Sequence, residues 1–556
     1  MAAPGFGKDM FSNLKAELPG QLPAYLKGQR WFGAKARELR ATEVVDFIAL
    51  ERDALHALIV MVKVEYEGGG ADLYSVPLVV AKDSDPKKDP GSNLNGEPGA
   101  PGKDSDSNVG PGAPERSLAA LTVSGRISGE TLTLSDALKN ETFLSLLLDA
   151  IERGLVFTGE AGELVTSHTH ALSMQETGAA GSLRPRAITA EQSNSSVAYG
   201  DRLILKFFRR LEEGENPDLE VGGFLTEKAH YQHTPQLLGA LEYRGARGVR
   251  MTQGILQGFV PNQGDAWQYT MKSISNFYNE VGKSLAESSV ADLQNNAARA
   301  SIATFLESVG LLARRTAELH LALASPAAAT EADFAPEPFD DKFQRGFEDA
   351  LLELTNRIFG QLRHAQDRLP ENARPKVEKV LASELEIIER FRAALSKPIR
   401  AVRTRIHGDY HLGQVLYTGA DFVIIDFEGE PARPLSQRRL KRSPLQDVAG
   451  MLRSFHYAAH APLLAATGSV NVDDSNREKL KGWAEVWAKW VSERYLDEYL
   501  KTALGAEFLP PSREEIIGLL QLHVLEKAVY ELGYELNNRP GWVAIPLEGI
   551  FKTLES

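Results

Sequence analysis

The amino-acid sequence predicts a two-lobed α+β fold, in which a β-rich first half precedes a mainly helical second half. Short β-branched runs such as "ALIVMVKVEY" and "RLILKFF" fill the region before residue 261. Helical periodicity dominates after it, as in "SIATFLESVGLLARRTAELHLALA". The chain has 556 residues, which is too long for one ordinary core. We therefore expect several domains, with a cleft between the two lobes.

The boundaries follow from where the patterns change. We expect a small, mostly β domain over residues 1–135, an intermediate β lobe over 136–260 and a helical lobe over 261–556. Residues 82–115 are almost wholly Gly, Pro, Ser, Asp, Asn and Lys, so we interpret them as a mobile surface insertion in the first domain. The stretch "SDALKNETFLSLLLDAIERG" reads as a helix opened by a Ser or Asn cap.

Composition and charge exclude several classes of function. With 43% hydrophobic and 25% charged residues the chain is typical of soluble globular proteins. A formal net charge of −13 argues against nucleic acids and anionic membranes as partners. No apolar run approaches the ~20 residues that span a bilayer, and the N-terminus does not read as a secretory signal. We expect a cytoplasmic protein, in keeping with its lack of cysteine.

A strand, a short polar turn and a second strand offer a way to handle phosphate. The turn "QSNSSVAYG" carries Ser195 and Ser196, whose hydroxyls could cover a triphosphate, and Lys206 in the next strand could hold its α- and β-phosphates. Glu220, on the following helix, could fix that lysine by a charge-assisted bond. The same features also occur in proteins that bind no phosphate, because Ser/Asn turns between strands are common and a lysine at the end of a strand often only extends its ammonium group into solvent.

The stretch "HGDYHLGQ", residues 407–414, carries the chemistry. In phosphoryl transfer to a hydroxyl, a carboxylate accepts or orients the hydroxyl proton, and oxygen ligands hold Mg²⁺ against the phosphates. Asp409 supplies the first group, while Gln414 and Asp426, at the end of "FVIID", supply metal ligands. This order of aspartate, amide and second aspartate is that of the catalytic loop and metal-binding strand of protein-kinase-like phosphotransferases.

Other polar residues near this stretch have two interpretations. We expect His407 to be a structural histidine that bonds loop backbone. His411 could point at an acceptor sugar or cap the turn, and Glu428 could assist the metal or bind a sugar hydroxyl. Asp447 stands where the helical pattern resumes, so we expect it to cap a helix.

The segment "EKAVYELGYELNNRPGW" could hold a sugar. Aromatic faces and bidentate polar groups are common sugar contacts, and the segment offers Tyr530, Glu531, Tyr534, Asn538, Arg539 and Trp542. Tyr530 and Tyr534 share one helical face. An amphipathic core helix predicts the same spacing, and periodicity alone favours the core.

Long stretches of the chain resemble the maltokinases, within the aminoglycoside-phosphotransferase and kinase-like superfamily. The likeness runs through "LPAYLKGQRWFGAKAREL", "EQSNSSVAYGDRLILKFFRRLEEGENPDLEV", "HGDYHLGQVL", "IIDFEGEPARPLSQRRLKRSPLQDVAGMLRSFHYAA" and "VYELGYELNNRPGWVAIPL". The insertion at 82–115 and residues around 276–300 have no counterpart.

The resemblance implies a bilobal protein-kinase-like fold with an N-terminal cap over residues 1–135, an intermediate β lobe and a mainly helical C-lobe. It also implies transfer of the γ-phosphate of ATP, with Mg²⁺, to the anomeric hydroxyl of maltose. The product, maltose 1-phosphate, would serve α-1,4-glucan synthesis. The family also occurs fused to trehalose synthase, which is therefore an expected partner by fusion or complex.

The resemblance assigns roles to residues of this chain. It makes Asp409 the catalytic base, Gln414 and Asp426 the magnesium ligands and Lys206 the phosphate lysine. It places ATP against Ser195, Ser196, Lys206, Glu220 and the hinge segment that contains Gln257 and Phe259, whose backbone would pair with adenine. It places the sugar against His411, Glu428, Tyr530, Glu531 and Arg539.

Two alternatives remain from the sequence. One is a glucosamine kinase of the same fold, which an acidic pocket able to hold an ammonium group would favour. The other is a catalytically silent sugar- or nucleotide-binding partner of a glucan-synthesising enzyme. The intact positions Lys206, Asp409, Gln414 and Asp426 argue against the second alternative.

Overall fold

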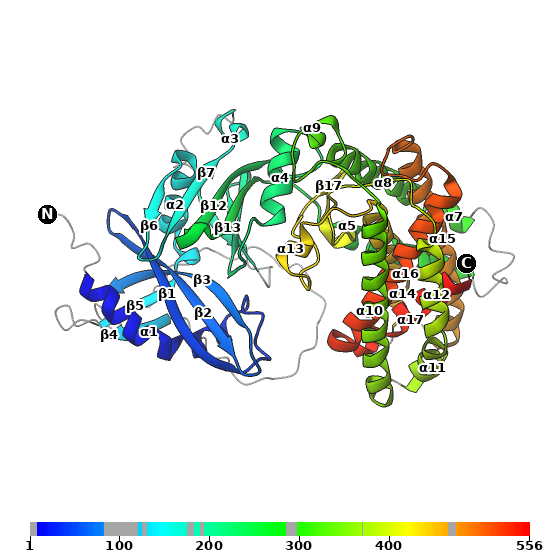
Figure 1. The fold of residues 1–556 in the computed structure, drawn as a ribbon, viewed down its shortest axis with the longest axis horizontal. Coiled ribbons are helices and arrows are strands. Elements are labelled where there is room, and N and C mark those ends of the chain that lie inside the picture. Colours follow the sequence, from blue (N-terminus) through cyan, green and yellow to red (C-terminus); the bar gives the residue numbers. More distant parts are fainter. Residues whose placement is uncertain are drawn as a thin grey trace. The chain divides into compact units, whose positions relative to one another are not determined.

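The computed structural model shows an α+β protein that divides into two compact units (Figure 1). It describes residues 8–82, 120–124, 131–174, 183–188, 194–284, 297–369, 371–464 and 474–555. The first unit comprises Met1–Leu219 and Leu237–Phe259, and the second comprises Glu220–Gln236 and Val260–Ser556. Residues 220–236 thus group with the helical unit, whereas the sequence places all of 136–260 in the intermediate lobe. The predicted insertion, apart from Lys82, lies outside the described residues.

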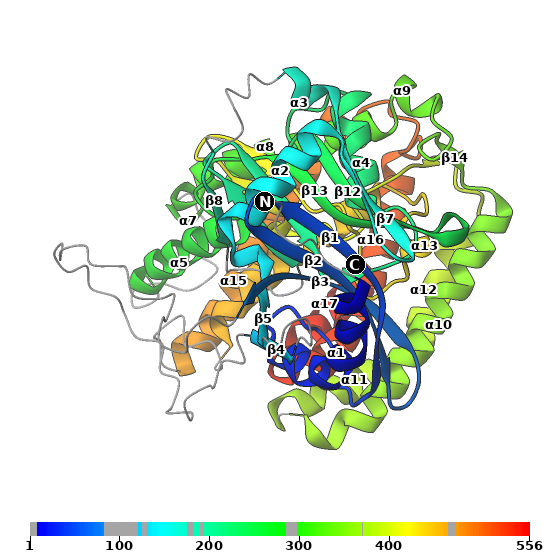
Figure 2. The same ribbon diagram turned by 90° about the vertical axis from the view of Figure 1, so that its left-hand side faces the viewer.

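The first unit contains an antiparallel sheet with the strand order β1-β2-β3-β5-β4, to which β11 adds beside β3. Its strands are β1 (Leu39–Arg52), β2 (Leu55–Tyr66), β3 (Ala71–Lys82), β4 (Ala120–Ser124), β5 (Thr131–Asp136) and β11 (Arg210–Leu211). Figure 2, in which the first unit faces the viewer, shows β1, β2 and β3 side by side. The β-branched runs of the sequence therefore form the strands that their alternation predicts.

Both faces of this sheet are buried, which explains why β2 is an almost unbroken apolar run. Successive side chains of a strand point to opposite faces. Leu58, Val60 and Val62 pack into one apolar cluster, and Ile59 and Met61 pack into another. The first of these clusters includes the leucines of α1 (Lys8–Gly28), which recur at the four-residue spacing that keeps one helical face apolar.

A second antiparallel sheet of the first unit carries the predicted phosphate lysine. Its strand order is β6-β7-β12-β13-β10-β9-β8. The strands are β6 (Val156–Thr158), β7 (Gly162–His168), β8 (Pro185–Ile188), β9 (Asn194–Tyr199), β10 (Leu203–Phe208), β12 (Leu237–Gly245) and β13 (Arg250–Gly258). Helix α2 (Glu141–Arg153) packs on this sheet and begins at the Asn cap that the sequence predicts, since the Asn140 side chain accepts from the Phe143 amide. The short helix α3 (His170–Met174) follows β7.

The second unit is mainly helical. Its long helices α10, α12, α14 and α16 run side by side (Figure 1), in agreement with the contacts of α10 and α14 with α16. The helices are α5 (Ala266–Ser284), α7 (Ala297–Ser301), α8 (Ala303–Leu323), α9 (Pro326–Ala329), α10 (Asp341–Ala365), α11 (Arg374–Ala382), α12 (Glu384–Leu395), α13 (Leu435–Arg438), α14 (Leu445–His460), α15 (Asp474–Thr502), α16 (Arg513–Asn538) and α17 (Ala544–Glu555). Helix α4 (Pro217–Glu227) crosses the division between the units. None of the described helices is long and apolar enough to cross a membrane.

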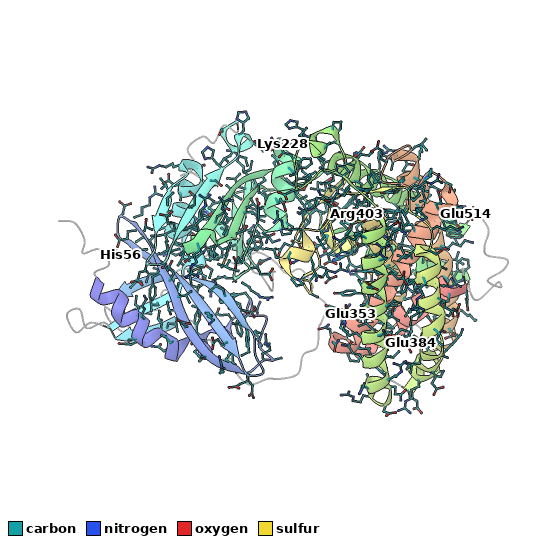
Figure 3. The ribbon with its side chains drawn as sticks, viewed as in Figure 1. His56, Lys228, Glu353, Glu384, Arg403 and Glu514 are labelled. Carbon is teal, nitrogen blue, oxygen red and sulfur yellow. The ribbon has the colours of Figure 1, made fainter. Side chains whose placement is uncertain are left out.

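Two small two-stranded sheets frame the stretch "HGDYHLGQ". Strands β14 (Glu337–Pro338) and β15 (Val402–Arg403) pair before it, and β16 (Val415–Tyr417) and β17 (Phe422–Ile424) pair after it. Arg403 fixes the entry to the loop, because its guanidinium lies 3.8 Å from the centre of the Phe343 ring and donates to Glu337 at 2.9 Å (Figure 3). The loop thus starts and ends at paired backbone.

Candidate active site

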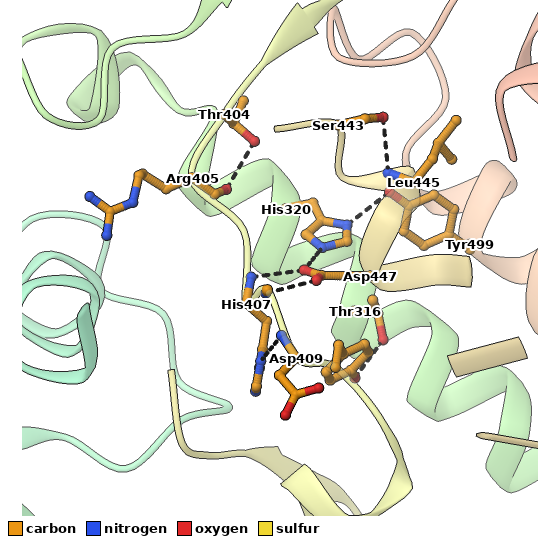
Figure 4. Close-up of polar contacts among 12 residues, drawn as sticks. Thr316, His320, Thr404, Arg405, His407, Asp409, Ser443, Leu445, Asp447 and Tyr499 are labelled. Atoms are coloured by element: carbon orange, nitrogen blue, oxygen red, sulfur yellow. Dashed lines mark hydrogen bonds and ion pairs between the residues drawn. The ribbon is translucent and has the colours of Figure 1, made fainter. Parts of the chain in front are cut away.

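The loop "HGDYHLGQ" is held from within the helical unit by the carboxylate of Asp447 (Figure 4). The backbone amides of His407 and Gly408 donate to its two oxygens at 2.8 and 2.9 Å. His320 Nε2 lies 3.0 Å from the same carboxylate, and the Tyr499 hydroxyl lies 2.8 Å from His320 Nδ1. A buried carboxylate is tolerated only with such partners. Asp447 is therefore structural, but the prediction that it caps a helix is wrong. The residue that precedes α14 is Pro444, which makes no side-chain cap, and Asp447 uses its carboxylate from the first turn of α14 to anchor the loop.

The two histidines of the loop both serve its conformation. His407 is buried, and its Nε2 lies 2.9 Å from the carbonyl oxygen of Ile425, which matches the structural role expected for it. His411 Nδ1 accepts from the backbone amide of Gly413 at 3.0 Å. Of the two roles left open for His411, the structure shows the cap on the turn.

Asp409 lies beside an ammonium group that the sequence does not single out. Lys527, on α16, places Nζ 3.5 Å from Asp409 Oδ1 and 3.5 Å from Glu430 Oε2. His411 Nε2 lies 4.0 Å from the other oxygen of Asp409. Burial alone would lower the pKa of Lys527, but the carboxylates of Asp409, Glu430 and Glu531 raise it above its usual value. Lys527 is therefore a fixed positive charge beside the predicted base.

Gln414 and Asp426 lie together, as the predicted metal site requires. Gln414 Nε2 donates to Asp426 Oδ2 at 2.9 Å. Asp426 has a φ of +68°, in the left-handed region that few residues other than glycine adopt, so the chain bends sharply where β17 ends. Amide and carboxylate oxygens are the ligands that Mg²⁺ prefers, so this pair fits the ion. Glu428 follows two residues later, and its carbonyl oxygen accepts from Arg438 at 3.4 Å.

Lys206 lies inside β10, as predicted, but its expected partner is wrong. Its Nζ lies 3.1 Å from Asp218 Oδ2. Glu220 instead accepts two bonds from Arg439, at 2.8 and 2.9 Å, and lies 2.8 Å from Arg405. Residues 218 and 220 lie two apart, which turns their side chains about 200° apart around a helix axis, so only one can face the lysine. The aspartate does so.

Ser195 and Ser196 lie in β9, where the sequence predicts a turn. They pair with Phe207 and Lys206 of β10, and residues 189–193 before them lie outside the described residues. Ser195 Oγ accepts from Arg209 Nε at 2.9 Å, and the Arg209 guanidinium binds Asp136 at 2.7 Å. The strand therefore begins at Asn194, further back than its polar composition indicates, and the Ser195 hydroxyl has a partner within the first unit.

The predicted adenine hinge uses its backbone within the first unit. Gln257 lies in β13 between partners on both sides, Ile204 of β10 and Leu237 of β12. The Phe259 amide donates to the carbonyl oxygen of Arg202 at 2.8 Å. Of the backbone groups of this segment, the Phe259 amide is therefore already satisfied, and pairing of the remaining groups with adenine stays a prediction.

Tyr530 is the predicted sugar residue that the structure places beside Asp409 and its neighbours. Lys527 Nζ lies 4.9 Å from the centre of the Tyr530 ring, and burial and the nearby Glu430 raise the pKa of Tyr530. The carboxylate of Glu531 is held by the buried Arg453, whose Nε donates to Oε2 at 2.8 Å and whose Nη2 forms an ion pair with it at 2.7 Å.

Arg539 does not lie with Tyr530. It follows α16, where it donates to Glu535 at 2.7 and 3.0 Å and covers the ring of Trp542 at 4.5 Å. Nine residues of helix separate positions 530 and 539, which corresponds to about 13 Å. Tyr534 is 47% exposed and belongs to the same end of the helix. The six residues of the predicted sugar segment are thus split between two places along α16.

The chain is similar to known proteins in one domain and in its fold. Residues 25–103 match the maltokinase N-terminal cap domain. A solved glucosamine kinase, described as crystal form B, is 18% identical and superposes with a TM-score of 0.60 over 96% of this chain and 97% of its own. A glucosamine kinase in complex with glucosamine, ADP and inorganic phosphate is 17% identical and gives 0.56 over 92% and 93%. The chain therefore contains a region similar to the maltokinase cap domain and shares the fold of the solved glucosamine kinases.

Two curated relatives of the chain are glucosamine kinases. That of Mycolicibacterium smegmatis is 28% identical over 278 residues, which cover 49% of this chain and 59% of the relative. That of Streptacidiphilus jiangxiensis is 24% identical over 377 residues, which cover 66% and 73%. The chain thus matches less than two thirds of the first relative's length.

The sequence analysis does not identify two residues of the site, Asp218 and Lys527. Asp218 stands in "PDLEV", two residues before the glutamate that the sequence favours, and only the rotation of the helix distinguishes them. Lys527 precedes Tyr530 by three residues, so it shares the helical face of the predicted aromatic, and that spacing was the available signal.

Proposed function

We propose that the chain is an ATP-dependent sugar kinase that transfers the γ-phosphate to the anomeric hydroxyl of maltose, giving maltose 1-phosphate. The proposal depends mainly on the geometry of the loop "HGDYHLGQ", residues 407–414, in the second unit. Its aspartate, Asp409, stands in backbone that Asp447 anchors, and its amide, Gln414, is bonded to Asp426 at 2.9 Å. The maltokinase-type cap over residues 25–103 supports the choice of maltose.

In the proposed reaction Asp409 accepts the proton of the sugar hydroxyl. The hydroxyl oxygen forms a bond to the γ-phosphorus, the bond from that phosphorus to the β–γ bridging oxygen breaks, and ADP leaves. Asp409 suits this role because its side chain is 19% exposed and lies beside Lys527, which orients it by charge. Most of the rate in such transfers comes from positioning and charge neutralisation.

Magnesium and nucleotide contacts complete the proposal. Gln414 and Asp426 would hold Mg²⁺, which neutralises charge on the phosphates when it is bound. Lys206 would hold the α- and β-phosphates of ATP, and Asp218 would keep its ammonium in place. In this proposal Asp218 takes the place that Glu220 has in the sequence prediction.

We favour maltose over glucosamine because a cation, Lys527, already neutralises part of the negative charge beside Asp409. An amino sugar brings an ammonium group, and a pocket for it needs net negative charge. Here Lys527 lies between Asp409 and Glu430, each at 3.5 Å, so the two carboxylates already share a cation. The relatives named glucosamine kinases keep that acceptor as the second candidate. Trehalose synthase, as a source of maltose, is part of the same proposal.

The test is an acceptor panel with MgATP, in which phosphorus NMR detects an anomeric phosphate. We expect maltose to be phosphorylated and glucosamine to be a poor acceptor. Asp409→Asn should abolish turnover and leave ATP affinity within a few-fold, because the group acts mainly in the transition state. Phosphorylation of glucosamine alone would replace the proposed acceptor, and an active Asp409→Asn variant would remove the proposed base.

A further inference from the structure

A cluster of histidines lies in the second half of α14, more than two turns beyond the residue that anchors the catalytic loop. His456 and His460 are one helical turn apart and face the same way, with ring centres 4.5 Å apart. Both are buried, at 7% and 5% exposed. Two histidines at this spacing on one helical face are a frequent metal-binding pair.

A carboxylate from a second helix completes the cluster. Glu485, on α15, places Oε1 2.9 Å from His460 Nε2. One ligand atom from each of His456, His460 and Glu485 lies within 4.8 Å of the other two. Ligands of one tetrahedral zinc ion lie about 3.4 Å apart, given bonds of about 2.0–2.1 Å, so a small closing movement brings the three atoms to one ion.

The surroundings resemble those of metal-binding histidines. Glu548, on α17, places Oε2 3.8 Å from His460 Nδ1, on the ring edge away from Glu485. A carboxylate on this side of a histidine, once it approaches to the hydrogen-bond distance of about 2.7–3.2 Å, fixes the ring and leaves its other nitrogen for the metal. Burial lowers the pKa of His460 to about 4 and that of His456 well below its usual value.

A second observation that points to a ligand at this cluster concerns His456. Its Nε2 is buried and has no hydrogen-bond partner among the described residues. Buried polar atoms without partners are rare, because each costs about 1–3 kcal/mol. The ion pairs of the cluster leave His456 Nε2 without a partner, whereas a bound metal ion would supply one.

The side chains of two cationic residues contact the cluster and would have to move when a metal ion binds. Lys552, on α17, forms an ion pair with Glu485, and its side chain is 43% exposed, so it can turn to solvent. Arg453 Nη1 lies 3.3 Å from His456 Nδ1, but its shorter bond, at 2.8 Å, goes to Glu531 and holds it without the histidine.

We propose that His456, His460 and Glu485 form a binding site for a divalent transition-metal ion of the zinc type, which ties α14 to α15. The set of two imidazoles and one carboxylate suits Zn²⁺ or Co²⁺ and not Mg²⁺, which prefers oxygen ligands. The site is separate from the carboxylate and amide of the catalytic loop, so it does not depend on the proposed sugar kinase activity.

The test uses untagged full-length protein, because a histidine tag would itself bind metal. Zn²⁺ binding is measured by calorimetry in excess Mg²⁺, which fills oxygen-ligand sites, and the visible spectrum of the Co²⁺ form reports the geometry. We expect one equivalent per chain, a tetrahedral Co²⁺ spectrum and a melting temperature that rises with Zn²⁺. Both His456→Asn and Glu485→Gln should weaken binding by about tenfold or more.

Glu478→Gln is the matched control, since Glu478 lies on α15 two turns before Glu485 and is exposed. It should bind Zn²⁺ as the wild type does. If His456→Asn does not fold, Glu485→Gln alone decides, because Glu485 is partly exposed. A wild type without stoichiometric Zn²⁺ binding, or a Glu485→Gln variant that binds equally well, overturns the proposal.

Discussion

His320 and Asp447 form a buried pair beneath the catalytic loop, with Nε2 of the imidazole 3.0 Å from Oδ2 of the carboxylate. The carboxylate also accepts the amides of His407 and Gly408, so one side chain links α8, α14 and the loop. Since the loop carries Asp409, its position depends on a residue that takes no part in the proposed reaction. The pair is therefore a place where stability and activity are coupled.

Asp447→Asn should destabilise the protein and lower activity together. An asparagine offers one oxygen, so its NH₂ group would face a donor, and we expect the free energy of unfolding to fall by about 3 kcal/mol. Urea unfolding and sugar phosphorylation measure the two effects. Asp340→Asn is the control, because Asp340 caps α10 and asparagine caps as well as aspartate does. Equal stability of the two variants would contradict the anchoring role.

The same carboxyl predicts a pH dependence. Burial alone would raise the pKa of Asp447, but the bond with His320 and the amide of Gly408 hold it below its usual value. A carboxyl with a lowered folded pKa stabilises the protein above its unfolded pKa, about 3.9, and loses that contribution as the pH falls through the folded value. The stability difference between wild type and Asp447→Asn should thus be constant above about pH 5 and shrink below about pH 4.

Urea unfolding between about pH 3 and pH 7 measures this difference. The titratable groups around Asp447 include His320, His407, Tyr410, Tyr495 and Tyr499. A difference that already shrinks near pH 6 would assign the effect to an imidazole instead, since histidine titrates there.

Asp426→Asn should remove activity and leave the fold intact. Asp426 has a φ of +68°, and asparagine tolerates that conformation almost as well as aspartate. The variant keeps the shape and loses the charge, so we expect turnover to fall by about 100-fold or more with little change in melting temperature. Asp426→Ala should in addition lose about 1–2 kcal/mol of stability, because a left-handed backbone is costly for alanine.

Asp53 offers a matched control for that pair of variants. It also has a positive φ, +51°, but lies exposed in the first unit between β1 and β2. Asp53→Ala should lower stability by a similar amount and leave phosphorylation unchanged. An Asp426→Asn variant that keeps wild-type turnover would rule out Asp426 as a metal ligand.

The sequence predicts the elements whose signals are local. The Asn140 cap, Lys206 within its strand and the helix around Tyr530 follow from neighbours in the chain, and the structure shows each of them. The α+β fold with its β-rich and helical halves follows from the same local periodicities, summed along the chain. The helix α1 is not predicted, because Pro19 and Pro23 inside it argue against a helix, and its leucines are buried by a sheet distant in sequence.

The errors in the site concern which partner a charged group selects. Glu220 and Asp218 are equally plausible partners for Lys206 in the sequence, and the choice depends on helix rotation and on Arg405 and Arg439, which lie far along the chain. Glu531 likewise forms an ion pair with Arg453, a partner that is distant in the sequence. Such long-range pairings have no local pattern, so the catalytic loop is predictable and its surroundings are not.

Asp218→Asn should weaken ATP binding. Without the carboxylate 3.1 Å away, the Lys206 ammonium loses its fixed position, so we expect the KM for ATP to rise by about tenfold with a smaller effect on kcat. Lys206→Met should have a larger effect in the same direction. Asp201→Asn, in the exposed turn between β9 and β10, is the control and should behave as wild type. An unchanged KM in Asp218→Asn would separate this ion pair from the nucleotide.

Lys527→Gln tests the choice between maltose and glucosamine. Its ammonium lies 3.5 Å from both Asp409 and Glu430, and a neutral side chain leaves these two carboxylates without the shared cation. We expect kcat/KM for maltose to fall by about tenfold or more, because Asp409 loses its orienting charge, and the ratio of glucosamine to maltose turnover to rise. Lys479→Gln, an exposed lysine of α15, should change neither value. A fall for both sugars with an unchanged ratio would mean that Lys527 positions the base without selecting the acceptor.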